Sequence, residues 1–152
     1  MAASARTGSR PRRRRVSERT LLRVARRVLA WEGARDVRVE LTLLGAPAMQ
    51  RLNRRATGRR GLTDVMAFAL PQPDGSIVGE VCICPTVAEG WLTTTDNGTP
   101  TTDDLRSELI RLMVHGTLHV LGYDHPEGRG RTRSTMWRRQ ERYVRRLTAG
   151  GR

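Results

Sequence analysis

Apolar residues recur with helical spacing near the start of the chain and alternate with polar residues soon afterwards. From Ser17, which can cap a helix, leucine, valine and alanine recur every three or four residues up to Gly33, so this segment predicts an amphipathic helix. Residues 37–43 (VRVELTL) alternate strictly, which indicates a half-buried strand. Pro47 suits the first turn of a helix, and we expect a short helix over residues 48–55.

A hairpin is predicted in the middle of the chain. Residues 57–62 are rich in glycine and arginine, which favours a loop. Residues 63–70 and 77–84 have the composition of strands, and the segment between them, 71–76 (PQPDGS), is typical of a turn. The two strands should therefore pair with each other.

Helical patterns dominate the second half of the chain. The expected elements are a short helix at residues 85–91, a polar loop at 93–102, a longer helix capped by Asp103 or Asp104 and ending near Leu121, and a basic helix at 132–147. The whole order, α-β-α-β-β-α-α-α, predicts an α/β (α+β) fold in one domain. Its small mixed sheet of about three to four strands would contain the hairpin and be covered by about five helices.

The domain is expected to span residues 17–148, with a short tail at 149–152. Residues 1–16 are rich in arginine and poor in apolar residues, so we expect a disordered arm. Such an arm can neutralise phosphates without sequence preference. A solvated tail or an organelle-targeting segment would have a similar composition, so these alternatives stay open.

Charge is strong and unevenly distributed. All 28 basic residues are arginine, and the net charge is +13. Codon usage in a GC-rich genome would explain arginine in place of lysine, but not the net charge. Residues 1–60 hold 17 arginines against 4 acidic residues, residues 61–125 hold 2 against 9, and residues 126–152 hold 9 against 2. Two basic ends suit a nucleic acid partner, and the acidic middle suggests a bound cation.

Composition also excludes several classes of protein. The two cysteines, Cys82 and Cys84, are too close in sequence to staple the fold and lie on one face of the predicted strand, where they suit burial as small apolar side chains. A reducing, cytoplasmic location fits better than secretion. No apolar stretch approaches the ~18 residues of a membrane span, and we expect neither a membrane association nor a secretory signal.

All three histidines lie within residues 115–125 (HGTLHVLGYDH). His115 and His119 are four residues apart on a helix, so their Cβ atoms should be ~5–6 Å apart on one face. Gly122 can end the helix with a positive φ and turn the chain, so that His125 reaches the same point. Three imidazoles suit one Zn²⁺ per chain and leave a fourth position open, as catalytic zinc sites do. This histidine cluster, which lies in the C-terminal half of the domain, is the strongest candidate site in the sequence.

The spacing H-x-x-x-H-x-x-G-x-x-H is that of the metzincin proteases, which carry glutamate directly after the first histidine. Here that residue is Gly116, so peptide hydrolysis by that mechanism is disfavoured. Asp124 is the nearest acidic residue. It could act as a base, orient a histidine by a hydrogen bond, or cap the turn, and the supporting roles are favoured.

The histidine segment closely resembles the signature of the YbeY family of bacterial rRNA maturation factors, which are regarded as single-strand endoribonucleases. Three further segments are similar to the family's: Leu52-Asn53 followed by residues 63–68 (TDVMAF), residues 79–84 (GEVCIC), and the pair Met136 and Glu141. The resemblance runs from about residue 18 to residue 147.

This resemblance implies a metal-dependent endoribonuclease acting in 16S rRNA 3′ end maturation and ribosome quality control. It further implies zinc on the three histidines, a cytoplasmic location, and rRNA, the small ribosomal subunit and assembly factors as partners. The family's active-site arginine aligns with Thr57, its serine with Ala67 and its proline with Leu62. Arg59, or else Arg55 or Arg60, is then expected to clamp the phosphate.

Arg51 and Arg54, together with Arg55 and Arg60, are expected to hold the RNA backbone. Few aromatic residues are available for base stacking, so binding should be mainly electrostatic. Three other functions stay open from the residues alone. They are a zinc hydrolase of peptides or small esters, a non-catalytic ribosome-assembly factor braced by zinc, and a plain nucleic acid-binding module.

Overall fold

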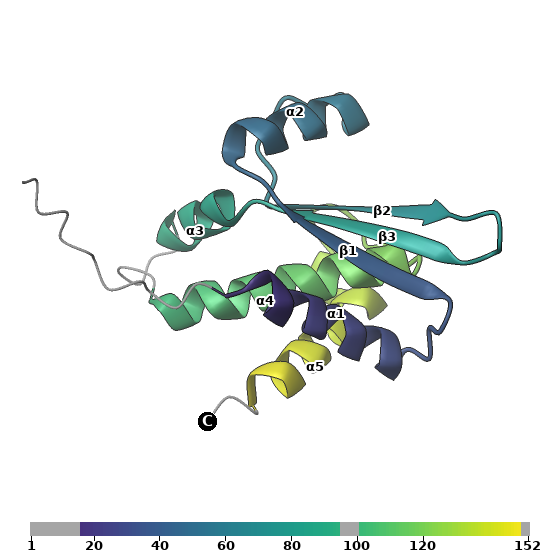
Figure 1. The fold of residues 1–152 in the computed structure, drawn as a ribbon. Helices are drawn as coiled ribbons and strands as arrows, with labels where there is room; N and C mark the ends of the chain where they lie inside the picture. The colour runs from purple at the N-terminus through teal and green to yellow at the C-terminus, as the bar shows by residue number, and fades with distance from the viewer. Residues whose placement is uncertain (1–15, 95–100, 150–152) are drawn as a thin grey trace, which may run out of the picture.

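A computed structural model describes residues 16–94 and 101–149 of the chain (Figure 1). Their elements are, in order, α1 Glu18–Trp31, β1 Val37–Leu43, α2 Ala46–Thr57, β2 Val65–Pro71, β3 Ile77–Ile83, α3 Pro85–Thr94, α4 Thr102–Val120, the 3-10 turn η1 Arg131–Arg133, and α5 Thr135–Ala149. The predicted arm, part of the predicted polar loop and most of the predicted tail lie outside the described residues, at 1–15, 95–100 and 150–152. No helix in the described ranges is long and apolar enough to cross a membrane.

The three strands form one mixed sheet in the order β1-β3-β2. β1 runs parallel to β3, with Val37 opposite Ile77. β2 runs antiparallel to β3, with Val65 opposite Ile83, and forms the predicted hairpin. The predicted fold class, a single domain with a small mixed sheet and about five helices, is therefore confirmed.

The sheet separates two hydrophobic clusters. Helices α1, α4 and α5 lie on one side of the sheet and α2 on the other (Figure 1). The larger cluster joins α1, α4 and α5 to β3 through fully buried side chains such as Leu21, Met113 and Leu118. The smaller cluster, under α2, contains Met49 and both cysteines, which are free thiols and buried, as their predicted shared face requires.

Helix α4 approaches the central strand closely because each element has a glycine at the contact. A Cβ atom on Gly116 of α4 would lie 2.7 Å from Val81 Cγ1 of β3. A Cβ atom on Gly79 of β3 would lie 2.5 Å from Val120 Cγ1 of α4. Since both distances are shorter than carbon atoms tolerate, only glycine allows the backbones to come this near.

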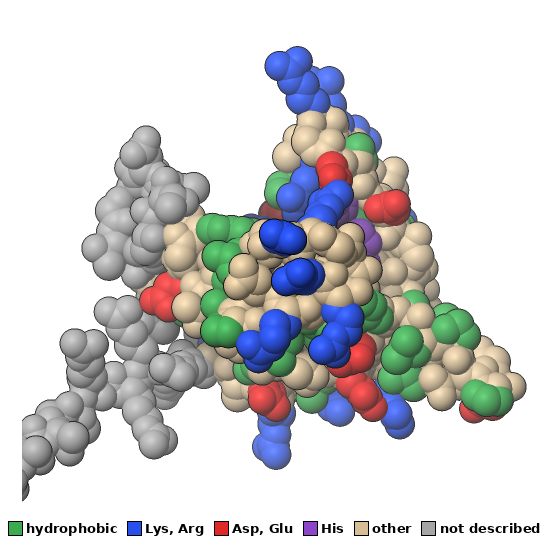
Figure 2. All heavy atoms as spheres, turned by 90° about the horizontal axis from the view of Figure 1, so that it is seen from above, with side chains coloured by type: hydrophobic (Ala, Val, Ile, Leu, Met, Phe, Trp, Pro, Cys, Tyr) green, Lys and Arg blue, Asp and Glu red, His purple; other side chains and the backbone are tan. Residues whose placement is uncertain are grey.

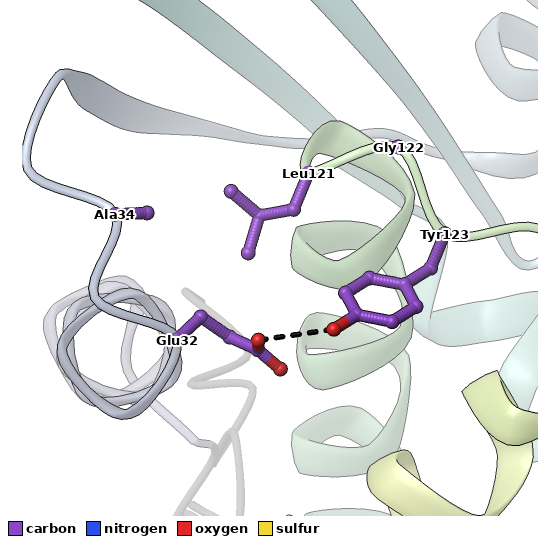
Figure 3. Close-up of a pocket in the computed structure, with 5 residues that line it drawn as sticks. All are labelled: Glu32, Ala34, Leu121, Gly122 and Tyr123. Carbon is purple, nitrogen blue, oxygen red and sulfur yellow. Dashed lines mark hydrogen bonds between the residues drawn. The ribbon is translucent and has the colours of Figure 1, made fainter.

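The carboxylate of Glu32 ties three parts of the chain together just beyond the end of α1. It accepts hydrogen bonds from the hydroxyl of Tyr123 at 3.1 Å and that of Tyr143 at 3.0 Å. It also pairs with Nη1 of Arg139 at 3.3 Å. Figure 3 shows Tyr123 reaching across a pocket from the turn after α4 to Glu32. This cluster fixes α5 and that turn relative to α1.

Some predicted helix ends were wrong. Neither Asp103 nor Asp104 caps α4: the N-cap is Thr101, whose hydroxyl accepts from the Asp104 backbone N–H at 3.1 Å. Asp104 completes a capping box by accepting from the Thr101 backbone N–H at 2.8 Å. The last helix begins at Thr135 rather than at residue 132, because η1 occupies the residues before it.

We expect Gly116→Ala and Gly79→Ala each to lower the free energy of unfolding by about 1–3 kcal/mol, because the added methyl group has no space between α4 and β3. Urea titration followed by circular dichroism would measure the change. Gly90→Ala in α3 is the control, because its added Cβ meets no atom within 4 Å. Equal stability of all three variants would contradict the close contact.

Candidate metal centre

The last two turns of α4 and the loop after it bring the three histidines together. His115 and His119 stand one turn apart, and Gly122, with φ +94°, turns the chain so that His125 returns to them. One nitrogen from each ring lies within 4.8 Å of the other two. His115 is 7% exposed, whereas the other two are half-buried, so the cluster has one side accessible to solvent.

Each histidine uses its Nδ1 atom in a hydrogen bond to an oxygen that can only accept. The contacts are His115 Nδ1 to Gln140 Oε1 at 2.7 Å, His119 Nδ1 to the Tyr123 carbonyl at 2.9 Å, and His125 Nδ1 to the Pro126 carbonyl at 3.2 Å. In the tautomer that satisfies these oxygens, the hydrogen lies on Nδ1, and Nε2 carries a free lone pair. This is the tautomer that a metal-binding histidine needs.

Two of these lone pairs face each other, since His115 Nε2 and His119 Nε2 are 3.0 Å apart. Burial lowers the pKa of His115 to about 4 and also lowers the pKa of His119, so both rings are neutral at pH 7. Two acceptors at this distance repel each other unless a cation lies between them. The donor set therefore fits a metal ion, and three imidazole nitrogens suit Zn²⁺.

Gln140 of α5 sets the orientation of His115, and sequence reasoning missed it. Its side chain is 1% exposed, and its Nε2 donates to Glu141 Oε1 at 3.2 Å, which leaves Oε1 to face the histidine. Glu141 in turn accepts from Arg111 Nε at 2.8 Å. A polar residue among the buried residues of α5, beside Met136 and Val144, was the available signal.

The structure also explains the missing protease glutamate. Because position 116 faces Val81 of β3, a side chain there would enter the core rather than approach the histidine nitrogens. Asp124 is exposed, and its Oδ1 accepts from the His125 backbone N–H at 2.8 Å. This contact fits the supporting roles that the sequence favoured for Asp124.

Arg59 is the predicted arginine that the structure brings beside the histidine loop. It forms a two-pronged pair with Glu127, two residues after His125, with distances of 3.1 and 3.3 Å. Both side chains are largely exposed, so the pair is weak and the guanidinium can exchange partners. Thr57 stabilises the same loop, because its hydroxyl donates to the Asn53 carbonyl at 2.7 Å and accepts from the Arg59 backbone N–H at 3.2 Å.

The other predicted RNA contacts lie on the sheet side opposite to α4. Arg51, Arg54 and Arg55 are exposed on α2, and Arg60 is exposed in the loop that follows. Figure 2, which views the molecule from this side, shows basic side chains over α2 with histidine visible beyond them. The Arg59–Glu127 pair links the loop after α2 to the histidine loop.

Sequence reasoning also missed Arg131 and Asp64. Burial raises the pKa of Asp64 to about 6, and the charge of Arg131 opposes that rise. The same charge adds to the burial that lowers the pKa of His115. Arg131 therefore adds positive potential at both groups. Nothing in the sequence distinguishes it from the other arginines of residues 126–152.

Comparisons with known proteins show the family of this chain. The family model described as "Endoribonuclease YbeY" matches residues 8–148. Two relatives named endoribonuclease YbeY come from Thermotoga sp. (strain RQ2) and Rhodococcus jostii (strain RHA1). The first is 32% identical over 109 residues, covering 72% of this chain and 67% of its own. The second is 34% identical over 124 residues, covering 74% of this chain and 66% of its own.

A solved structure is also similar. The solution structure of a Thermotoga maritima protein matches with a TM-score of 0.58 and 26% identity, covering 90% of this chain and 87% of the other. The range that the family model matches spans the sheet, α4 and most of α5, and the relatives align with most of the chain. On this basis, the chain belongs to the endoribonuclease YbeY family.

Proposed function

We propose that this protein is a metal-dependent endoribonuclease that holds one Zn²⁺ per chain on His115, His119 and His125. The observation that carries the proposal is the pair of Nε2 lone pairs 3.0 Å apart, with each Nδ1 bound to an acceptor. The names of the relatives support RNA as the substrate. The partly exposed rings of His119 and His125 support access for a substrate.

In the proposed mechanism, His115, His119 and His125 would hold the zinc ion, which would supply Lewis acidity to a bound phosphodiester group. Arg59 leaves Glu127 and donates to the phosphate oxygens, where negative charge develops during cleavage. Arg131 adds positive potential at the same place. Arg51, Arg54 and the neighbouring arginines of α2 hold the RNA backbone without reading its sequence.

We further propose single-stranded regions of small-subunit (16S) rRNA as the substrate, with roles in 3′ end maturation and ribosome quality control in the cytoplasm. The small subunit and its assembly factors are the proposed partners. The sequence motifs shared with the YbeY family support this assignment, as do the basic side chains over α2 (Figure 2).

We expect His119→Ala to lose bound zinc and cleavage of a labelled single-stranded RNA together, because one of three ligands is removed. Zinc content measured by mass spectrometry and RNA cleavage would be compared on one purified sample. Circular dichroism would show whether the fold is intact. Cleavage that persists in the zinc-free variant would point to a contaminating nuclease and contradict the proposal.

We expect Gln140→Leu to lower zinc affinity about 10- to 100-fold, because His115 would lose the acceptor that fixes its tautomer. Competition with a chromogenic chelator would measure this affinity. Gln50→Leu, an exposed glutamine of α2, is the matched control. Equal zinc affinity in the two variants would show that Gln140 does not position His115.

We expect Arg59→Ala to lower kcat for RNA cleavage on the order of 100-fold, because a donor to the developing charge is removed. Arg38→Ala is the matched control, since Arg38 also forms an exposed pair with a glutamate, Glu40, at 3.1 Å. Steady-state kinetics on one short RNA would compare them. A loss in the Arg59 variant no greater than in the control would exclude Arg59 as the phosphate clamp.

A further inference from the structure

Helices α1 and α5, on the far side of the sheet from α2, carry arginines with the same spacing. Each has three arginines with i, i+4, i+8 spacing, and all six are exposed: Arg19, Arg23 and Arg27 on α1, and Arg138, Arg142 and Arg146 on α5. On a helix this spacing forms a single stripe with ~6 Å between successive residues. We call these six residues the α1–α5 arginine surface.

The two stripes meet where α1 ends. Trp31, one turn after Arg27, stacks on Tyr143 of α5 with ring centres 5.0 Å apart. The guanidinium of Arg146 lies 5.4 Å from the centre of the Trp31 ring. These contacts join the end of the α1 stripe to the end of the α5 stripe. Both helices lie below the sheet in Figure 1, whereas α2 lies above it.

The positive charge of this surface has no counterpart within the described part of the chain. None of the six arginines forms an ion pair with a described residue. Two of the neighbouring carboxylates are occupied elsewhere: Glu32 pairs with Arg139, and Glu141 pairs with Arg111. A third, Glu18, lies at the start of α1 directly before Arg19 and balances one of the six charges at most. Like charges at i, i+4 destabilise a helix, so both stripes weaken the isolated fold. This arrangement suits an anionic partner.

The surface is separate from the metal centre. Arg138 and Arg142 are each two residues from Gln140, which faces His115, and a shift of two residues on a helix points to the opposite face. The width of α5, ~10–12 Å with its side chains, therefore lies between this surface and the histidines. A partner that contacts both places must be larger than a short oligonucleotide.

We propose that the α1–α5 arginine surface binds the phosphate backbone of a structured region of RNA next to the single-stranded segment that is cleaved. Guanidinium groups bind phosphate oxygens in pairs of hydrogen bonds, which suits this partner. Tyr143 is buried and Trp31 is covered by Arg146, so bases do not stack here and binding is independent of sequence. The inference rests on the proposed function for its choice of RNA.

The test compares two double variants, Arg142→Gln/Arg146→Gln and Arg23→Gln/Arg27→Gln, with a control of equal charge. The control is Arg35→Gln/Arg106→Gln, which removes two exposed arginines outside the surface. The α1 variant removes no aromatic contact, so it is informative even if the α5 variant loses stability. Circular dichroism melts would check the fold of all three.

Fluorescence anisotropy would measure binding of two labelled RNAs over a series of KCl concentrations. One is a hairpin with a single-stranded 3′ tail, and the other is the tail alone. We expect each test variant to bind the hairpin RNA about 10-fold more weakly, with the slope of log K against log salt reduced by about 1–2. Binding and cleavage of the tail alone should equal those of the wild type.

Hairpin affinity and salt slope equal to those of the control would overturn the inference. Loss of binding to vesicles of anionic phosphatidylglycerol, with hairpin binding unchanged, would overturn it in favour of a membrane surface. Absence of cleavage by the wild type would contradict the proposed function alone, because anisotropy does not require cleavage. An arginine-dependent loss of hairpin binding would then still support this surface.

Discussion

The metal centre depends on the close contact between α4 and β3. Gly116 and Gly79 remove the two side chains that would separate these elements, so Val81 and Val120 fill the contact instead. The same contact directs position 116 into the core and leaves positions 115 and 119 on a different face of α4. Because this contact holds α4 rigidly, the imidazoles of His115 and His119 stay at a fixed separation. A metal ion requires such a fixed separation between its ligands.

Two polar side chains, the buried Gln140 and the largely buried Glu32, also orient the histidines. Gln140 holds His115 from α5, and Glu32 holds Tyr123, whose carbonyl holds His119. Hydrogen bonds between helices are strengthened where water is largely excluded, so these contacts favour one arrangement of helices around the site. The way α1, α4 and α5 pack together below the sheet thus determines how the rings of His115 and His119 are oriented.

The sequence was sufficient where the signal is local. The strands, the main helices and the histidine cluster follow from periodicity and from one i, i+4 spacing with a glycine turn. The positions of Gln140 and Glu32 could not be predicted, because their partners are 25 and 91 residues away in sequence. The cap of α4 was misplaced for a different reason: aspartate is favoured both at the N-cap and in the first turn, and only the hydrogen bonds assign it.

The acidic middle of the chain suggested a bound cation, and the candidate ligands that the described residues bring together are histidines. Its carboxylates serve the fold instead. Asp104 accepts from the backbone N–H of the N-cap residue Thr101, Asp74 accepts from Ser76 in the hairpin turn, and Glu108 pairs with Arg111. Because these carboxylates bind groups close to them in the sequence, they neutralise little of the positive charge of the arginines on α1, α2 and α5. The positive charge therefore remains on both outer sides of the sheet, where a polyanion larger than the domain can contact each of them.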